Sequence, residues 1–253
     1  MMIMKELGGK WMKLTNNQIS EIKKYPNSIY DELKKEFLYH SNKIEGSTFT
    51  RENLDVYLKN QMIEGSHKID DIFETINSLN LFDFVVDTLG EKLTKNLILE
   101  FHSILKKNSL DQERGFAGCF KKIPNMISGS AVTLAQPWEV DIRMDELLSF
   151  WESSKKDFKD IVKFHSKFEL IHPFQDGNGR VGRFIMLKQC IESNIDLIAI
   201  DEKYNSEYKK ALEESQIKEN FESLEEVLSK CQNFLEEKNE MLINTLKCLE
   251  EIG

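Results

Sequence analysis

Apolar residues recur at helical spacing along most of the chain. Leu97, Ile98, Phe101 and Leu105, for example, lie at positions i, i+1, i+4 and i+8, the stripe that a core-facing helix shows. Past Asp201, leucines at helical intervals predict a C-terminal helical pair that completes the core or forms a dimer surface. The same spacing predicts further helices over residues 28–45, 50–58, 66–90, 140–153, 158–171 and 181–187. The pattern therefore predicts an all-α, mainly helical fold.

Three of these helices begin beside a residue that can cap a helix N-terminus. Thr50, Ser66 and Thr94 each precede an apolar stripe, where a hydroxyl can accept a hydrogen bond from a backbone N–H of the first turn. Gly46 and Gly90 offer the left-handed conformation that often ends a helix. We expect helices to start at these caps and to end near these glycines.

The helical pattern breaks between residues 115 and 137. Short β-prone pieces flank the turn formed by residues 128–130. The residues that crowd into this stretch are turn formers, namely Gly115, Gly118, Pro124, Gly129 and Pro137. The stretch predicts a β-hairpin or flap over residues 120–136.

Composition agrees with a helical fold and argues against some partners. The 253 residues include only 12 glycines and 4 prolines, so few residues interrupt helices. The formal net charge of -9 gives no basic surface for nucleic acid, whose binding depends on phosphate neutralisation. No run of about eighteen apolar residues is present to span a bilayer. The four cysteines lack metal-binding spacing and no secretory pattern is present, so we expect a cytoplasmic protein without nucleic-acid or membrane partners.

These patterns divide the chain into four expected parts. Residues 1–27 form an N-terminal segment without an assigned function, and residues 28–94 form an N-terminal helical region. Residues 95–200 form the core with its flap and a polar loop, and residues 201–253 form the C-terminal helices.

One polar loop between two predicted helices concentrates reactive side chains. Residues 172–183 read His-Pro-Phe-Gln-Asp-Gly-Asn-Gly-Arg-Val-Gly-Arg. Gly177 and Gly179 lack the Cβ atom that would keep a ligand away from the backbone, and their N–H groups stand at the start of a helix, where anions bind. We therefore expect the loop to hold phosphate.

The charged residues of this loop suit a nucleotide reaction. Asp176 offers the oxygen ligand that Mg²⁺ prefers beside nucleotide phosphates. Arg180 and Arg183 can neutralise phosphate oxygens. His172 is a base that can take a proton from a hydroxyl group at neutral pH. Together they indicate attack of a hydroxyl on a nucleotide phosphate.

At every position this loop resembles the signature of the Fic family, His-x-Phe-x-(Asp or Glu)-Gly-Asn-Gly-Arg-x-x-Arg. The resemblance implies a Fic-type helical bundle with a small β-hairpin flap. It also implies a protein adenylyltransferase, which moves AMP from ATP to a Ser, Thr or Tyr hydroxyl of a protein and releases pyrophosphate. Mg²⁺ would be the cofactor and ATP the co-substrate. The target would be another protein or the enzyme itself, and a homo-oligomer is left open.

The resemblance also implies roles within the loop. His172 would be the general base, Phe174 an anchor in the core and Asp176 the Mg²⁺ ligand. Arg183 would contact the γ-phosphate. The nucleotide-binding residues would be Gly177, Asn178, Gly179, Arg180, Gly182 and Arg183.

Outside the loop, similarity to the family extends over roughly residues 95–190. Residues 120–136 correspond to the flap that aligns the target, with Ile127, Ser130 and Val132 as candidate target contacts. Downstream, Asn205 and Tyr208 resemble residues of the family's adenine pocket, with ordinary surface roles as the alternative. His102 and His165 are expected to be structural.

A second short motif resembles the inhibitory motif of Fic proteins, (Ser or Thr)-x-x-x-Glu-(Gly or Asn). Ser41 and Glu45 fit it and lie one helical turn apart, followed by Gly46. Glu45 would pair with Arg183 and occupy the arginine that the γ-phosphate needs, which predicts autoinhibition. Alternatively, the same carboxylate would orient a water molecule for removal of AMP.

Other interpretations of the loop stay open. Gly177, Gly179 and Gly182 also fit the G-x-G-x-x-G pattern of a Rossmann site, but no strand is predicted before them. An inactive Fic-like binding module and transfer from UMP, GMP or phosphocholine donors are further alternatives. The kinase-like Doc branch usually lacks the second glycine and the distal arginine found here as Gly179 and Arg183, which favours AMP transfer.

Overall fold

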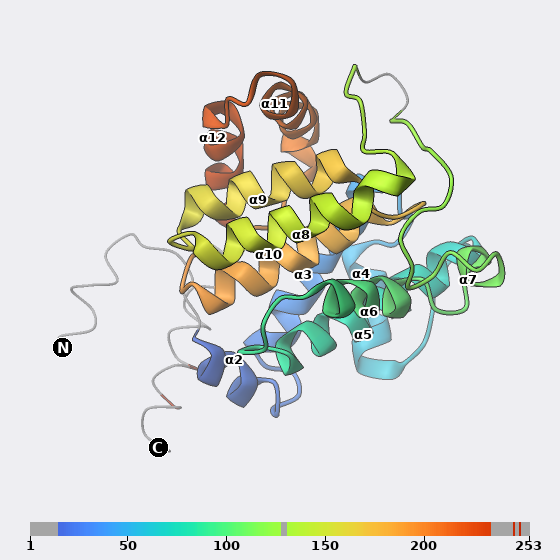
Figure 1. Ribbon diagram of the computed structural model, residues 1–253. Coiled ribbons are helices and arrows are strands. Elements are labelled where there is room, and N and C mark those ends of the chain that lie inside the picture. The colour runs from blue at the N-terminus through green and yellow to red at the C-terminus, as the bar shows by residue number, and fades with distance from the viewer. Residues whose placement is uncertain (1–14, 128–130, 234–244, 246–247, 249–253) are drawn as a thin grey trace, which may run out of the picture.

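The computed structural model describes residues 15–127 and 131–233, together with Thr245 and Cys248. These residues form helices and connecting loops without a β-strand, which confirms the predicted all-α class (Figure 1). The α-helices are α2 (Asn16–Ile22), α3 (Ile29–Ile44), α4 (Arg51–Asn60), α5 (Ile69–Asp87), α6 (Lys95–Leu105), α7 (Leu110–Glu113), α8 (Pro137–Ser153), α9 (Phe158–Ile171), α10 (Asn178–Glu192), α11 (Asn205–Lys218) and α12 (Glu222–Lys230). The short 3-10 helices are η1 (Glu202–Tyr204) and η2 (Cys231–Asn233).

Helix α10 lies at the centre of the fold. It packs against α9 and against α3, α5 and α6, and in Figure 1 it runs between these two groups of helices. Of its 15 residues, 13 are buried. Phe184 of α10 packs against Phe37 of α3, with ring centroids 5.3 Å apart. Because α10 begins at the end of the polar loop, the loop is anchored directly in the core.

The N-terminal helices begin and end largely where the sequence predicts. The hydroxyls of Thr50 and Thr94 accept hydrogen bonds from backbone N–H groups of the first turns of α4 and α6, which confirms both caps. Gly46 follows the end of α3 with a φ of +85°, and Gly90 follows the end of α5 with a φ of +90°. Both glycines therefore adopt the left-handed conformation that was expected of them. The structure also contains α2 and α7, which the periodicity did not predict.

The helix cap predicted at Ser66 is wrong, because α5 begins at Ile69. The residues directly before α5 are not helical, and His67 among them makes two contacts. Its imidazole contacts the Thr48 hydroxyl at 2.7 Å and the Glu64 carbonyl oxygen at 2.8 Å. The tertiary contact with Thr48 holds His67 outside the helix, which begins two residues later than the local sequence suggests.

The β-hairpin predicted over residues 120–136 does not form in the described part of that segment. Residues 120–127 and 131–136 contain no strand. Their backbone groups bond to the neighbouring helix and loop instead of to each other: Lys121 donates its N–H to the Pro173 carbonyl at 2.8 Å, and Ala135 donates to Leu170 at 3.4 Å. The segment is thus fastened along α9 and the polar loop.

The C-terminal helices complete the core. Helices α11 and α12 pack on α9 (Figure 1), and Leu224, Val227 and Leu228 of α12 are fully buried. This supports the core alternative for the described part of the C-terminal region. The leucines further along that belong to the same prediction lie outside the described residues, namely Leu235, Leu242 and Leu246.

The four-part division of the chain stays a prediction. Helices α3 and α5, from the expected N-terminal region, contact α10 of the expected core, so the two regions share their packing. Among the residues that the structure describes, no helix is both long and apolar enough to cross a membrane.

Candidate active site

The polar loop joins α9 to α10 through two left-handed residues. His172 ends α9 with a φ of +50°, and its N–H still donates to the Phe168 carbonyl at 2.9 Å. Gly177 caps α10 with a φ of +82°. A Cβ atom at Gly177 would lie 3.1 Å from Lys106 Cε, so both the conformation and the close approach favour glycine. The loop is therefore a tight turn with a base at its start and a helix N-terminus at its end.

Phe174 anchors the middle of the loop, as the resemblance implies. Its buried ring stacks on the imidazole of His102, with centroids 3.9 Å apart and an interplanar angle of 14°. The Asn178 side chain accepts from the Phe174 N–H at 2.7 Å and donates to the Phe174 carbonyl at 2.9 Å. The Asn178 side chain therefore holds the loop together, which leaves its backbone N–H as the group to meet a ligand.

His102 of α6 fixes the backbone beside Asp176. Its Nδ1 accepts a hydrogen bond from the Gly118 N–H at 3.1 Å, so the proton of the neutral ring must lie on Nε2. This Nε2 lies 3.0 Å from the Asp176 carbonyl oxygen and can donate to it. Burial lowers the pKa of His102 to about 4, so the ring is neutral at pH 7. His102 is thus structural, as expected, but it acts directly on the loop.

His172 is a neutral imidazole at the start of the loop. Burial lowers its pKa to about 4, and the positive charge of Lys121 acts in the same direction. Burial also lowers the pKa of Lys121, to about 8. Nδ1 of His172 is buried and has no hydrogen-bond partner. The ring can therefore accept a proton at neutral pH, which general-base catalysis requires.

Asp176 is an exposed carboxylate at the far end of the same turn. Its side chain is 60% exposed. The protein atoms around the carboxyl displace water and so raise its pKa, but Lys106 and Arg180 outweigh this effect and hold the pKa at about 2. An ionised, accessible carboxylate at a phosphate-binding turn fits a Mg²⁺ ligand. Lys106 makes the closest contact with Asp176, through Nζ and Oδ2.

The two arginines of the loop are both buried and both paired with acids from the N-terminal helices. Arg180 forms an ion pair with Glu74 of α5. Arg183 donates to the Ser41 hydroxyl at 2.9 Å, to the Ser41 carbonyl at 3.0 Å and to Glu45 Oε1 at 2.6 Å. Burial raises the pKa of Glu45, but Arg183 and Arg180 hold it below the usual value. The structure therefore brings Ser41, Glu45 and Arg183 together in the pairing that the second motif predicts.

Comparison with known proteins agrees with this geometry. Residues 92–190 match the sequence model of the Fic/DOC family. These residues form a Fic/DOC domain.

Similar curated sequences are named as adenylyltransferases. A probable protein adenylyltransferase of Aquifex aeolicus (strain VF5) is 32% identical over 133 residues, which cover 50% of this chain and 39% of that protein. The protein adenylyltransferase Fic of Aedes aegypti is 27% identical over 179 residues, which cover 68% of this chain and 35% of that protein. The chain thus spans little more than a third of the length of these relatives.

Solved structures share the fold. A Fic domain containing signaling protein from Bacteroides thetaiotaomicron superimposes with a TM-score of 0.68 at 22% identity, over 92% of this chain and 95% of that one. Fic-1 (residues 134–508) from C. elegans gives a TM-score of 0.69 at 18% identity, over 85% of this chain and 65% of that one. Because 92% of this chain is covered in the first comparison, the similarity of fold extends beyond residues 92–190.

Two glycines of the Fic loop differ in their surroundings. A Cβ atom at Gly179 would lie 2.6 Å from Glu45 Oε1, so this glycine faces Glu45 and its partner Arg183. A Cβ atom at Gly182 would lie 2.5 Å from Glu169 Oε1 and 3.1 Å from Phe168 Cδ1, both in α9. Gly182 therefore faces the packing of α9 on α10, although the resemblance includes it among the nucleotide-binding residues.

The candidate adenine residues lie in different environments. Tyr208 is buried, and its hydroxyl contacts His165 Nε2 at 2.7 Å within the core. Asn205 is the partly exposed first residue of α11. The burial of Tyr208 contradicts an ordinary surface role for this residue, while the adenine-binding role of Asn205 and Tyr208 stays a prediction.

The candidate target contacts lie on the segment that replaces the expected hairpin. Ile127 is 38% exposed and Val132 is partly buried, while Ser130 lies outside the described residues. Their role in target binding stays a prediction.

Sequence reasoning missed an ionic cluster beside the Fic loop. Lys106 at the end of α6 is 1% exposed, and its ammonium contacts Glu74 at 2.6 Å, Asp111 at 2.9 Å and Asp176. The three carboxylates offer oxygen atoms within 4.8 Å of one another, but the Lys106 ammonium already lies among them. The sequence held one indication of this cluster: Lys106 follows His102 by a single helical turn, so both lie on the face of α6 that meets the loop.

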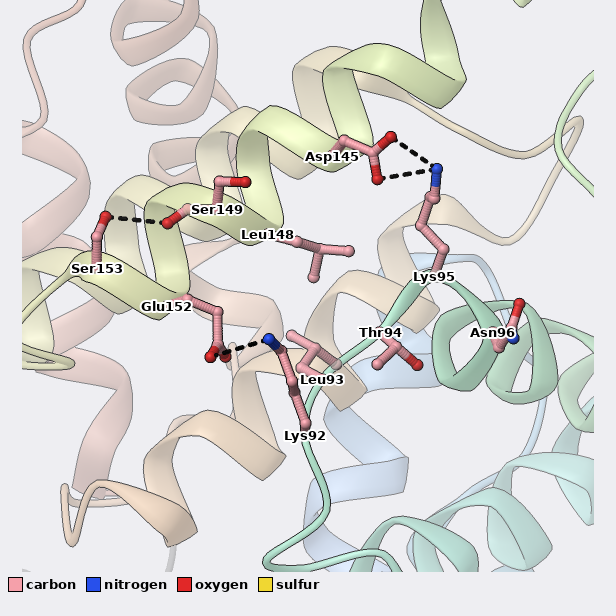
Figure 2. A pocket seen from close by; sticks show the side chains of 10 residues that line it. All are labelled: Lys92, Leu93, Thr94, Lys95, Asn96, Asp145, Leu148, Ser149, Glu152 and Ser153. Carbon is pink, nitrogen blue, oxygen red and sulfur yellow. Dashed lines mark hydrogen bonds and ion pairs between the residues drawn. The ribbon is translucent and has the colours of Figure 1, made fainter.

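One hollow lies at the loop, and a larger one lies elsewhere on the described part of the molecule. A cavity of about 230 Å³ lies against the loop and includes both arginine-pairing acids among its lining residues, which are Asn42, Glu45, Gly46, Ser47, Thr48, Lys68, Asp70, Asp71, Glu74, Thr75 and Arg180. A second hollow, of about 640 Å³, lies between the start of α6 and α8 (Figure 2). There Lys95 bonds Asp145 and Lys92 bonds Glu152, so its lysines are already paired.

Proposed function

We propose that this protein transfers AMP from ATP to a hydroxyl group of a protein and that Glu45 restrains the reaction. The observation that carries the proposal is the pairing of a neutral base, His172, with an ionised carboxylate, Asp176, on one phosphate-binding turn. The names of the curated relatives support the same activity. The target would be another protein or the enzyme itself, and the cytoplasm would be its location.

The residues of the turn suit each part of the reaction. The target oxygen would bond to the α-phosphorus of ATP, the bond from that phosphorus to the oxygen shared with the β-phosphate would break, and pyrophosphate would leave. His172 would accept the hydroxyl proton. The N–H groups at the start of α10 and the charge of Arg180 would stabilise negative charge on the phosphates.

Mg²⁺ would be held by Asp176. When bound, it supplies positive charge that neutralises phosphate oxygens. The protein's own contribution is to keep the Asp176 carboxylate ionised and oriented, through Lys106 on its side chain and His102 on its carbonyl oxygen.

Restraint by Glu45 rests on its contact with Arg183. The guanidinium donates to Glu45 Oε1 at 2.6 Å and is 3% exposed, so the γ-phosphate would have to displace Glu45 to reach it. An arginine already paired in a buried site is a poor partner for a second anion. ATP would then bind with its α-phosphate turned away from the target hydroxyl.

The test is transfer of label from ATP carrying a labelled α-phosphate. Wild type, Glu45→Gly and His172→Ala are incubated with Mg²⁺ and labelled ATP, and label on protein is followed by gel and mass spectrometry. Glu152→Gln, which removes a surface carboxylate paired with Lys92, is the charge control. We expect labelling to rise in Glu45→Gly and to fall by about 100-fold or more in His172→Ala.

Two outcomes would count against the proposal. Labelling that survives in His172→Ala would remove the base from its role. Binding of ATP without any transfer, also from other nucleotide donors, would favour an inactive binding module. Loss of label from a modified target on addition of wild-type protein, but not of Glu45→Gly, would instead assign AMP removal to Glu45.

A further inference from the structure

Glu74 lies outside the Fic loop. Its carboxylate contacts Lys106 and Arg180, the two cations that also contact Asp176. Its Oε1 accepts a hydrogen bond from Lys106 Nζ at 2.6 Å, and its Oε2 pairs with Arg180 Nη1. The side chains of Lys106 and Arg180 are 1% and 7% exposed, so water screens neither charge well. Each cation therefore depends on a neighbouring carboxylate.

The same two cations also reach Asp176, and both reach the same atom. Lys106 Nζ contacts Oδ2 directly, while Arg180 Nη2 lies 3.4 Å from it. Glu74 is a second carboxylate partner of each cation. The two acids, Asp176 and Glu74, thus share the two cations, Lys106 and Arg180, in one ionic network.

Without the charge of Glu74, Lys106 and Arg180 would pair more strongly with Asp176. A buried cation needs a counter-charge, and removing one partner of a buried ion pair leaves the other uncompensated. Arg180 would then have Asp176 as its near carboxylate, and Lys106 would have Asp176 and Asp111. Both cations already contact Asp176 Oδ2, and stronger pairing with it would weaken the attraction of this carboxylate for a divalent cation.

We propose that Glu74 is a positioning residue for Asp176: it shares the charges of Lys106 and Arg180 with the Asp176 carboxylate and thereby sets the affinity of the site for the divalent cation that accompanies the nucleotide. The inference rests on the proposed function, because that function makes Asp176 the cation ligand. Glu74 lies before residues 92–190, so the N-terminal helices would complete the cation site of the Fic core.

The test measures how much Mg²⁺ is needed for ATP to bind, without any turnover. Binding of labelled ATP is titrated against Mg²⁺ in a Glu45→Gly, His172→Ala background, in which Arg183 is released and transfer is blocked. Glu74→Gln is compared with Asp111→Asn. The second change removes the same charge from the same Lys106 ammonium but leaves the Arg180 pair with Glu74 in place.

We expect Glu74→Gln to raise the Mg²⁺ concentration for half-maximal ATP binding about five- to tenfold, which corresponds to one unit charge at an intermediate dielectric. Asp111→Asn should raise it less than about twofold, because Arg180 keeps its partner. At saturating Mg²⁺ the affinity for ATP should be equal in all variants.

Three results would overturn the inference. Equal shifts in Glu74→Gln and Asp111→Asn would mean that net charge alone matters. Tighter ATP binding in Glu74→Gln at every Mg²⁺ concentration would make Glu74 a restraint on Arg180. Failure of the background variant itself to bind ATP with Mg²⁺ would count against the proposed function, and so against both.

A folding control keeps the test decisive. Thermal melting is recorded for each variant. Should Glu74→Gln melt early, Glu74→Asp replaces it: the shorter side chain keeps the charge but cannot bridge both cations, so it too should raise the Mg²⁺ requirement.

Discussion

Arg180 and Arg183 lie nearly one turn apart on α10 and are both paired with an acid from the N-terminal helices, but the two acids are placed very differently. Glu45 is the residue directly after α3, and its side chain is 36% exposed. Glu74 lies inside α5, is 22% exposed and shares its carboxylate with Lys106. The acid that pairs with Arg183 therefore lies at the end of a helix, and the acid that pairs with Arg180 lies in the interior of another.

The difference bears on which pair can open. Glu45 is followed by Gly46 in the left-handed conformation, so a small change of the chain after α3 can withdraw the carboxylate. Withdrawal of Glu74 would require α5 to unwind or its side chain to leave two buried cations. We therefore expect the pair with Arg183 to be regulated and the pair with Arg180 to be permanent.

The largest expected effect separates the two acids directly. Replacing Glu45 by glycine should raise protein labelling about 10- to 100-fold, because Arg183 then becomes available to the γ-phosphate. Replacing Glu74 by glutamine should give no rise at saturating Mg²⁺. Rates of label transfer from ATP in the two variants make the comparison. A comparable rise in Glu74→Gln would show that both acids restrain the loop.

The next effect concerns the turn of α10 that lies between the arginines. In Gly182→Ala the new methyl group would lie 2.5 Å from Glu169 Oε1 and 3.1 Å from Phe168 Cδ1. Overpacking of this kind should lower the free energy of unfolding by about 1–3 kcal/mol, measured by denaturant titration. The ratio of labelling between Glu45→Gly and its parent should not change. An unaltered stability would contradict close packing of α9 on α10.

A smaller effect should follow from Ser41. Its hydroxyl accepts the Arg183 Nε–H at 2.9 Å, while its carbonyl oxygen and Glu45 hold the rest of the guanidinium. Ser41→Ala removes one of these three bonds and should raise labelling about three- to fivefold. Ser47→Ala is the matched control, because that hydroxyl accepts from Phe49 N–H and not from Arg183. Equal rates in both variants would exclude Ser41 from the restraint.

The smallest effect is expected from pH. The base acts in its deprotonated form and the pKa of His172 is lowered to about 4, so activity should be lost only as pH falls through that value. Labelling by Glu45→Gly should therefore change less than about twofold between pH 7 and 5.5, whereas a histidine with an ordinary pKa near 6.5 would lose about tenfold. The pKa of Glu45 is also lowered, so the ratio to wild type should hold across this range. A midpoint near pH 6.5 would contradict the buried, neutral base.

The sequence allowed the reactive loop to be predicted because its residues are adjacent. His172, Asp176 and Arg183 occur within twelve positions, and the helices on both sides follow from apolar periodicity. The pairing of Glu45 with Arg183 was predictable only through the family resemblance. Periodicity indicates which face of a helix is buried but not which residue on another helix it meets.

The remaining parts depend on contacts between distant segments. Glu74 lies 106 positions before Arg180 and 32 before Lys106, and no local pattern links these residues. The cap expected at Ser66 failed because His67 bonds Thr48 instead. In both cases tertiary contacts decided the outcome, and local sequence preference did not.

The tight turn between α9 and α10 also fixes how α10 is rotated about its own axis. An α-helix turns about 100° per residue, so one residue inserted or deleted between His172 and Gly177 would force α10 either to rotate by that angle within a fully occupied core or to lose its packing. Rotation would point Arg180 and Arg183 away from Glu74 and Glu45. We therefore expect the length of this turn to be invariant among related chains, while the loop before α5 and the segment over residues 115–136 accommodate insertions.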